Sequence, residues 1–478
     1  MLFIQSNSLA LRLNEDERLR LIAALGAQEF PPLIRSARWR CFELLVPAQG
    51  DAASAAAAAT ELERQLLADS QEQGAYSPGE LFCTDDCLLF LIFGASVEEG
   101  VSAGVVYDIN TSEPLRKLER FGRAVRAALG GREDESEAAG EPADGLPDWQ
   151  ARAHDVPQGL ARFIAGQPTD FAVAAKCRGS ARGLVRAAEL MEEHAVRAFL
   201  RRVQEMRREG YTPRRLFAEA DRLNCVSVAE MLAAGLLERE VRVSCRQSGH
   251  ALFDLPTPDS LAAITISKAR CSQCAAPVAD EVIEETINPT RLAVALLADG
   301  QWLSNRVYQI VRALGVPDSE IATGPASAHG ESYLAADVCG NSFLFVTKDG
   351  DLTPAFSRRI AETVAETEAT HLVVVITGVV EDEGRLRLYE FIWRRARDGQ
   401  DLDATLVEGL AGAQAEIARA FERAVRRELS RRLFTLDPAF GLSASSFVLN
   451  WFRLRRAPAA ADVKTAPRLF AADAAHVA

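Results

Sequence analysis

The sequence lacks several features by which a class of protein is most easily recognised. No apolar run among its 478 residues approaches the roughly 20 residues that a membrane-spanning helix needs. Residues 1–9 carry no basic region and no small-residue cleavage site, so we expect no secretory signal. Nine cysteines in a chain of this length do not make a disulfide scaffold, and we expect free, buried or metal-bound thiols. These absences predict a cytoplasmic protein.

Positive charge is also in short supply. The chain has 54 lysines and arginines against 67 aspartates and glutamates, which gives a net charge of −13. Because basic side chains supply most non-specific affinity for phosphates, this balance disfavours nucleic-acid binding by the chain as a whole. Two predicted helices are nevertheless rich in arginine, and they are solvated helix faces or phosphate-binding surfaces. If nucleic acid binds, we expect it at Arg197, Arg201, Arg423, Arg427 and Arg431.

The most informative part of the sequence is residues 331–378. A predicted strand ends at Asp337, a turn follows at Gly340-Asn341, and a second predicted strand carries Lys348 near its end. Amphipathic spacing then predicts a helix over 354–368. An unbroken apolar run predicts a strand over 372–377 that is covered on both faces. The segment reads as strand, turn, strand, helix and buried strand.

That order resembles the core of the PD-(D/E)xK superfamily, the restriction-endonuclease-like nucleases. In active members the second strand ends in Glu-x-Lys, and its Glu joins an earlier Asp in holding a divalent metal. The equivalent tripeptide here is Val346-Thr347-Lys348, so Asp337 and Lys348 are the site residues that the resemblance implies. The second carboxylate is missing.

That gap determines what the resemblance implies about chemistry. Mg²⁺ prefers an oxygen-rich shell, and a single carboxylate binds it weakly. Some members of the superfamily recruit a glutamate from the following helix, where Glu362 and Glu366 are the candidates. We therefore expect Mg²⁺ only if the site is active. The alternative is that Asp337 caps a turn and Lys348 is an ordinary surface lysine.

Cysteine spacing indicates a second site. Cys271 and Cys274 form an intact Cys-x₂-Cys pair, which resembles one knuckle of a zinc ribbon. The other knuckle begins at Cys245 but has Ser248 where its second thiolate would stand. His250 lies just beyond and can complete a Cys₃His set, so we predict a structural Zn²⁺ bound by Cys245, His250, Cys271 and Cys274. The alternative is a ribbon that holds no metal.

Residues 150–240 are predicted to be helical. One long amphipathic helix is expected over 184–208, and Thr212-Pro213 begins another. A short helix at 227–232 and a strand at 241–244 follow. This arrangement resembles a winged-helix or helix-turn-helix module, although plain helix packing produces the same pattern.

The remaining elements are predicted from periodicity alone. We expect strands at 39–46, 87–93, 104–109 and 386–393, and helices at 114–129, 289–314 and 416–433. The predicted fold class is α/β and multidomain. The expected parts are an α/β domain of unassigned role at 1–129, an acidic linker at 130–148, a helical and winged-helix-like region at 149–244, a zinc-ribbon-like region at 245–287, a nuclease-like α/β domain at 288–457 and a disordered tail at 458–478.

Three functions fit these observations. The first is a nucleic-acid-recognition or scaffolding subunit with a degenerate nuclease-like domain, in bacterial antiphage defence or DNA processing and with a protein partner. The second is an active metal-dependent nuclease with a relocated carboxylate. The third is a protein–protein adaptor that binds no nucleic acid.

Overall fold

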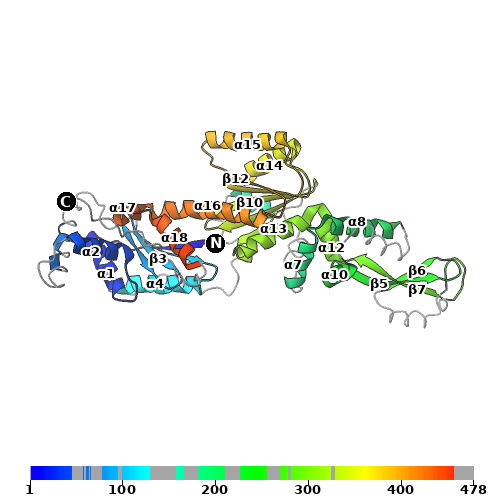
Figure 1. Cartoon of the computed structure of the whole chain (residues 1–478), viewed down its shortest axis with the longest axis horizontal. Coiled ribbons are helices and arrows are strands. Elements are labelled where there is room, and N and C mark those ends of the chain that lie inside the picture. The colour runs from blue at the N-terminus through cyan, green and yellow to red at the C-terminus, as the bar shows by residue number, and fades with distance from the viewer. Residues whose placement is uncertain are drawn as a thin grey trace, which may run out of the picture. The chain divides into compact units, whose positions relative to one another are not determined.

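The computed structural model describes residues 2–45, 57–58, 61–63, 65, 78–94, 100–129, 158–165, 181–209, 227–255, 270–277, 281–324 and 329–456 (Figure 1). It divides into two compact units, Met1–Ala138 with Glu422–Ala478, and Ala139–Phe421. The sequence places 288–457 in one domain, whereas the structure assigns the part after Phe421 to the unit that contains the N-terminus. The predicted linker at 130–148 and tail at 458–478 lie outside the described residues.

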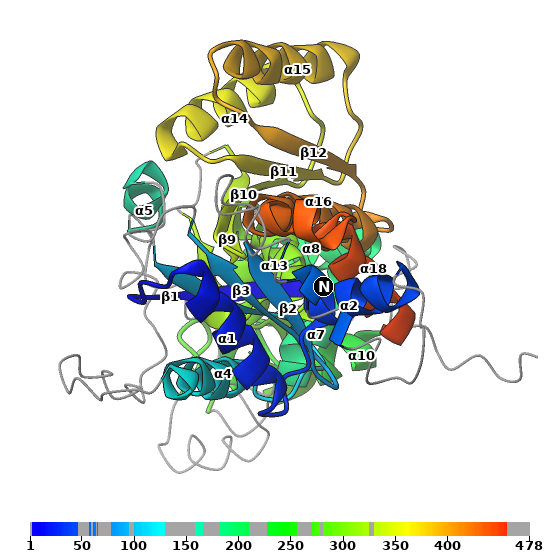
Figure 2. The same cartoon turned by 90° about the vertical axis from the view of Figure 1, so that its left-hand side faces the viewer.

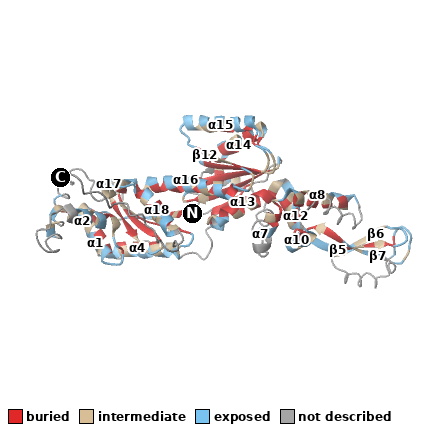
Figure 3. Ribbon diagram, viewed as in Figure 1, coloured by how far each residue is buried: buried red, intermediate tan, exposed pale blue. Residues whose placement is uncertain are grey.

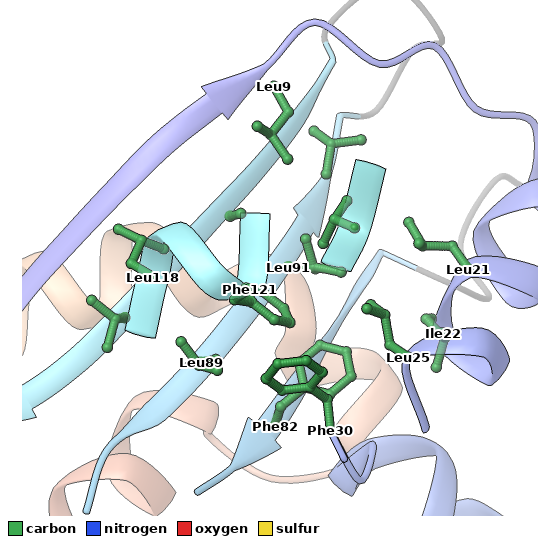
Figure 4. Packing of buried hydrophobic residues seen from close by; sticks show 14 of the residues in the cluster. Leu9, Leu21, Ile22, Leu25, Phe30, Phe82, Leu89, Leu91, Leu118 and Phe121 are labelled. Carbon is green, nitrogen blue, oxygen red and sulfur yellow. The ribbon is translucent and has the colours of Figure 1, made fainter. Parts of the chain in front are cut away.

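The first unit is built on an antiparallel sheet of four strands. In the order β1-β4-β3-β2, these are β1 (Leu2–Leu9), β4 (Val101–Asp108), β3 (Leu88–Phe93) and β2 (Gly79–Cys83). Helices α1 (Glu15–Gly26) and α4 (Pro114–Ala128) close a buried core against one face of this sheet (Figure 4). Phe121 of α4 lies at the centre, with its ring 5.2 Å from the rings of Phe30 and Phe82. The predicted strands at 87–93 and 104–109 and the helix at 114–129 are confirmed.

The same unit contains one helix where the sequence pattern predicts a strand. Residues 39–46 fall largely in α2 (Leu33–Leu45). The Glu80 carboxylate on β2 accepts hydrogen bonds from the backbone N–H groups of Ile34 and Arg35, at 2.6 and 3.0 Å. A carboxylate at this position satisfies amides that no helical turn can satisfy. Because that carboxylate comes from a distant strand, local propensity cannot reveal it.

The C-terminal part of the chain contributes helices. These are α16 (Ala413–Leu433), η4 (Phe434–Leu436), α17 (Asp437–Phe440) and α18 (Ala444–Arg456). The predicted helix at 416–433 is confirmed by α16. Its residues up to Phe421 belong to the second unit and the rest to the first.

The second unit is organised around a mixed sheet in the order β12-β11-β10-β9-β8 (Figure 2). An antiparallel meander of β8 (Ile321–Thr323), β9 (Glu331–Val338) and β10 (Asn341–Lys348) is followed by β11 (His371–Ile376) and β12 (Asp403–Glu408), which run parallel to β10. Every residue of β11 is buried, as its apolar run predicts. The crossover helices α14 (Pro354–Thr367) and α15 (Asp382–Arg397) pack on one face. On the other face, the Phe343 ring packs edge-on against Phe421 of α16.

Ahead of this sheet lie short helices and a smaller antiparallel sheet. The helices are α5 (Gln158–Ala165), α7 (Ala181–Leu190), α8 (His194–Arg208), α10 (Val228–Ala233), α12 (Arg291–Leu297), η2 (Ala298–Gly300), α13 (Gln301–Ala313) and η3 (Asp318–Glu320). The sheet has the order β6-β5-β7, with β6 (Ala251–Leu255), β5 (Leu237–Cys245) and β7 (Glu281–Pro289). Of the predicted helix-turn-helix pair, α10 is present, while the helix expected from Thr212 lies outside the described residues.

Two long helices predicted in this region are each broken in two. The helix expected over 184–208 is interrupted between α7 and α8, where the Arg197 guanidinium donates to the carbonyl oxygens of Met191 and Glu192 at 2.6 and 2.8 Å. Those bonds satisfy carbonyls at the end of α7 that have no partner within the helix. The helix expected over 289–314 is interrupted at Gly300, whose φ of 72° lies in the left-handed region.

The strand predicted at 386–393 is also wrong, because these residues lie within α15. Gly384 and Leu388 are buried, whereas Leu386 is 58% exposed. This is the four-residue repeat of a helix lying on a surface, and not the two-residue repeat of a strand. The apolar run is too short for periodicity to separate the two. At the level of fold class, the structure confirms a multidomain α/β protein, and none of the described helices is long and apolar enough to cross a membrane.

The helical structure at 386–388 predicts that two neighbouring leucines contribute very differently to the free energy of unfolding. Residues two apart share a face in a strand but lie on nearly opposite faces of a helix. Leu388→Ala should therefore lower the free energy of unfolding by about 3 kcal/mol, since it empties a buried site, and Leu386→Ala should change it by less than about 0.5 kcal/mol. Chemical denaturation of the two variants at low protein concentration measures both values. Equal losses would contradict the helical assignment.

Candidate functional site

The β9–β10 hairpin separates the two residues that the nuclease resemblance brings together. Its register places Asp337 opposite Ser342 and Lys348 opposite Glu331. Six residues along a strand correspond to about 20 Å, so Asp337 and Lys348 lie at opposite ends of the hairpin. The predicted pairing of these two side chains at one metal site is therefore corrected.

Asp337 belongs to the turn. Its Oδ1 accepts a hydrogen bond from the Gly340 backbone N–H at 2.9 Å. Cys339 and Gly340 have φ values of 55° and 78°, so both central residues of this two-residue turn are left-handed. The Asp337 carboxylate stabilises a turn that costs Cys339 backbone strain. Its observed contact is that of a turn-capping residue, the alternative reading of Asp337 from the sequence.

A different carboxylate lies beside Lys348. Glu331 is fully buried, and its Oε1 is 3.6 Å from the Lys348 Nζ and 2.7 Å from the Nε of Arg359 on α14. Its Oε2 accepts a hydrogen bond from the Tyr333 hydroxyl at 3.3 Å. The Lys348 Nζ also lies 4.6 Å from the centre of the Phe356 ring, a cation–π contact. We call Glu331, Tyr333, Lys348 and Arg359 the Glu331 cluster.

In the Glu331 cluster, Lys348 and Arg359 neutralise the negative charge of the buried Glu331 carboxylate. An isolated buried carboxylate is very costly, whereas one that is paired and hydrogen-bonded is tolerated. The hydrogen bond from Arg359 to Glu331 raises the pKa of that guanidinium, so it remains a cation. Burial raises the pKa of the Tyr333 hydroxyl, which stays a neutral donor. Lysine, arginine and phenol together occupy the space around the carboxylate in which a metal ion would need further oxygen ligands.

The remaining wall of this site is apolar. Val346, two residues before Lys348 on the same face of β10, is buried among Leu344, Leu352 and Phe356. The replacement ligand Glu362 lies on α14 but is exposed, and it interacts electrostatically with Arg359. No group of three potential metal ligands forms here; across the described ranges, the only such group is made by cysteines. The geometry does not assemble an oxygen site for Mg²⁺.

A second ion-pair network begins at the residue after Lys348. The Asp349 carboxylate lies 3.5 Å from both Arg197 and Arg201 of α8, and it accepts hydrogen bonds from Trp302 at 3.2 Å and Thr377 at 2.8 Å. Burial alone would raise the pKa of Asp349, but the Thr377 hydrogen bond and the Arg197 charge hold it below its ordinary value.

Arg197 takes part in this ion-pair network and is not a surface residue. Its side chain is 9% exposed, and the guanidinium stacks over the Trp302 ring at 4.1 Å. Burial lowers the pKa of this guanidinium, although Asp349 opposes the shift. The predicted nucleic-acid contact at Arg197 is therefore corrected, because the residue joins α8 to the sheet. Arg201 is 47% exposed and remains half available to solvent.

Three of the four predicted zinc ligands come together at the C-terminal end of β5. The sulfur atoms of Cys245, Cys271 and Cys274 lie within 4.8 Å of one another, and those of Cys245 and Cys274 are 3.4 Å apart. Cys245 and Cys271 are buried and Cys274 is exposed. This cysteine cluster could hold a metal ion. The side chain of His250 is not part of it.

Ser248, and not His250, lies beside the cysteine cluster, and backbone hydrogen bonds explain why. In one knuckle, the Cys245 N–H donates a hydrogen bond to the His250 carbonyl oxygen, and the Cys245 carbonyl oxygen accepts one from the Gly249 N–H, both at 2.8 Å. The knuckle at Cys271 repeats this pattern at 2.9 Å. Ser248 is therefore equivalent to Cys274, three residues after its cysteine. Its hydroxyl lies 3.5 Å from the Cys271 sulfur, and hydrogen bonds from Ser248 first, and from the backbone N–H groups of Cys274 and Gln273, lower the pKa of Cys271 to about 6.

Sequence analysis misses two members of the Glu331 cluster, Glu331 itself and Arg359. Glu331 can be found by counting outward from the turn once its central residues are placed at Cys339 and Gly340, because Lys348 then pairs with Glu331. Moving the turn by one residue, to Gly340 and Asn341, hides it. Arg359 has no comparable local signal, since it reaches the cluster from a separate helix.

Comparison with protein-family models, with curated proteins and with solved structures finds no match for this chain.

The Glu331 cluster predicts an asymmetric response to mutation. Arg359→Ala leaves a buried carboxylate short of a partner and should lower the free energy of unfolding by about 3 kcal/mol. Arg358→Ala, which removes an exposed arginine from the neighbouring position of α14, should have little effect. Adding Glu331→Gln to Arg359→Ala should recover part of the loss, because it removes the unpaired charge. Chemical denaturation of the four proteins tests this; equal effects of the two arginine variants would contradict the assignment.

Proposed function

We propose that this chain is a nucleic-acid-recognition or scaffolding subunit whose nuclease-like domain is catalytically inactive. The observation that carries the proposal is the Glu331 cluster. A metal-dependent nuclease needs carboxylate oxygens to hold the ion that activates water. Here the available carboxylate is buried between Lys348 and Arg359, and Val346 supplies no second one.

The topology of the second unit supports placing this domain near the PD-(D/E)xK superfamily. The hairpin β9-β10, the crossover helix α14 and the parallel strand β11 follow the element order on which the sequence resemblance rests. Such a subunit suits bacterial antiphage defence or DNA processing, where a partner protein supplies the chemistry.

The arginines of the first unit supply the nucleic-acid surface in this proposal. Arg423, Arg427 and Arg431 repeat every four residues along α16 and are exposed, so they share one face of the helix. Glu428 pairs with Arg431 at 2.7 Å and reduces the net positive charge at that end. Exposed arginines in a row contact phosphates without reading bases, which predicts binding that is weakly selective and strongly salt-dependent.

Binding assays test the proposal directly. We expect salt-sensitive binding of DNA or RNA by the full chain, and no cleavage in Mg²⁺ or Mn²⁺. The double variant Arg423→Gln/Arg427→Gln should weaken binding and reduce the slope of log affinity against log salt by about 2, or about 1 per lost phosphate contact. Arg358→Gln serves as the matched control, since it removes an exposed arginine from α14.

Two results would overturn the proposal. Metal-dependent cleavage that is lost in Glu331→Gln would make the chain an active nuclease. Absence of binding to single-stranded or duplex DNA and RNA at low salt would favour the adaptor function, particularly if a protein partner co-purifies in stoichiometric amount.

We further propose that the cysteine cluster binds a structural Zn²⁺. Thiolates are preferred zinc ligands, and the two equivalent knuckles present three thiols and the Ser248 hydroxyl around one point. The Zn²⁺ would join the two knuckles at the tip of the smaller sheet, which has the strand order β6-β5-β7. Its role would be structural, because three thiolates and the Ser248 hydroxyl would close a four-ligand shell with no open position for a substrate.

Measuring the zinc content of single variants tests which residues are ligands. Cys271→Ala should abolish stoichiometric zinc, measured by elemental analysis after dialysis, while His250→Ala should retain it. Ser248→Cys should tighten binding against a competing chelator, because it completes a four-thiolate shell. Cys41→Ala, at an exposed cysteine in the first unit, is the control and should not change the zinc content. Loss of zinc in His250→Ala would restore the ligand set predicted from the sequence.

A further inference from the structure

Helix α15 presents an apolar stripe to solvent. Leu386 is 58% exposed, Tyr389 52% and Trp393 74%. The opposite side of the helix, with Gly384 and Leu388, is buried against the rest of the second unit. α15 is the outermost layer over α14, and its outer surface is exposed (Figures 2 and 3). Large apolar side chains gathered on one exposed face mark an interaction surface more often than scattered ones do.

The stripe has a charged residue at each end. Asp382, Leu386, Tyr389, Trp393 and Arg397 are separated by four, three, four and four residues, which keeps all five on one face of the helix. The first turn of α15 is acidic and its last turn is basic. From Asp382 to Arg397 the stripe is about 22 Å long at the helical rise of 1.5 Å per residue.

We propose that this stripe is the contact surface for a second copy of the same chain, with the two α15 helices packed antiparallel about a two-fold axis. The stripe is complementary to its own reverse. When one helix is turned end for end, Asp382 lies level with Arg397 of the other copy, and Leu386 lies level with its Trp393. Tyr389 then lies beside the axis. A two-fold contact requires this kind of self-complementary surface.

Charge favours a second copy over the other occupants. A nucleic acid would gain from the basic end, with Arg394, Arg395 and Arg397, but would be repelled by Asp382 and Glu383 at the acidic end. A uniformly acidic or basic partner meets the same conflict. An antiparallel second copy satisfies both ends at once, because each acidic turn faces a basic turn.

The size of the stripe sets the expected strength. A pair of helices of this length forms a small interface, so we expect a reversible dimer whose population depends on protein concentration. Tyr389 and Trp393 are the anchors, since aromatic residues carry much of the energy of such contacts. This inference does not depend on nucleic-acid binding or on zinc.

Analytical ultracentrifugation of the full chain between about 1 and 100 µM, the range in which small interfaces dissociate, provides the test. Trp393→Ser should weaken the dimer at least about tenfold, because it removes an anchor twice. Asp382→Arg and Arg397→Asp should each weaken it by roughly fivefold to tenfold, since every exposed ion pair is broken twice by the symmetry. Glu366→Arg, a charge reversal at an exposed position of α14, should leave it unchanged.

Mixing the two charge variants gives the sharpest result. A heterodimer of Asp382→Arg with Arg397→Asp restores opposite charges at both ends, so the mixture should associate more tightly than either variant alone. Residues 382 and 397 are too far apart on one helix to restore each other within a chain. Circular dichroism should show the same helix content in every variant, because these positions are exposed.

Three outcomes would overturn the proposal. A chain that is monomeric throughout the concentration series has no such interface. A dimer that is insensitive to the stripe variants uses another surface. If Trp393→Ser instead lowers nucleic-acid binding with no change in sedimentation, the stripe is a nucleic-acid contact.

Discussion

A carboxylate without access to water must be paired, and this requirement organises the end of the central sheet in the second unit. Glu331 comes from β9, Lys348 from β10 and Arg359 from α14, so one buried anion holds two strands and their crossover helix in a single arrangement. The hairpin register is a precondition, because a shift of one residue would move the carboxylate to the other face of the sheet. The same pairing that stabilises the domain consumes the oxygen atoms that a catalytic metal would use.

Much of the fold can be predicted from the sequence where periodicity and burial agree. The strand β11 is apolar throughout because both of its faces are covered, and α14 carries Phe356, Ile360 and Val364 at helical spacing. Prediction fails where a side chain outside an element decides its local structure. The Glu80 carboxylate on β2 caps α2 from 46 residues away, and the Arg197 guanidinium on α8 binds the carbonyl oxygens at the end of α7. The first contact is too distant to be seen locally, and the second is close in sequence but is not indicated by helix periodicity.

The site shows the same division. Lys348 and the three cysteines are identified from short motifs, because their spacing along the chain reflects their spacing in a hairpin or a knuckle. Asp337 lies beside the turn in either register, so its pairing with Lys348 comes from the resemblance and not from the hairpin spacing, whereas Glu331 is missed because the turn is displaced by one residue. His250 is a reasonable ligand by composition, but in the structure Ser248, and not His250, is the residue equivalent to Cys274. Contacts across elements, such as that between Arg359 and Glu331, follow only from the tertiary structure.

The adjacent residues Lys348 and Asp349 have a consequence for how the second unit opens. Lys348 engages Glu331 and the α14 side, while Asp349 engages Arg197 on α8 and Trp302 on α13. The end of β10 is thus joined both to the crossover helix α14 and to the helices α8 and α13. Fraying there would break both networks together, leaving buried charges without partners on each side. Local opening at this point is therefore coupled to much larger unfolding, and the sheet and the α8 region behave as one cooperative body.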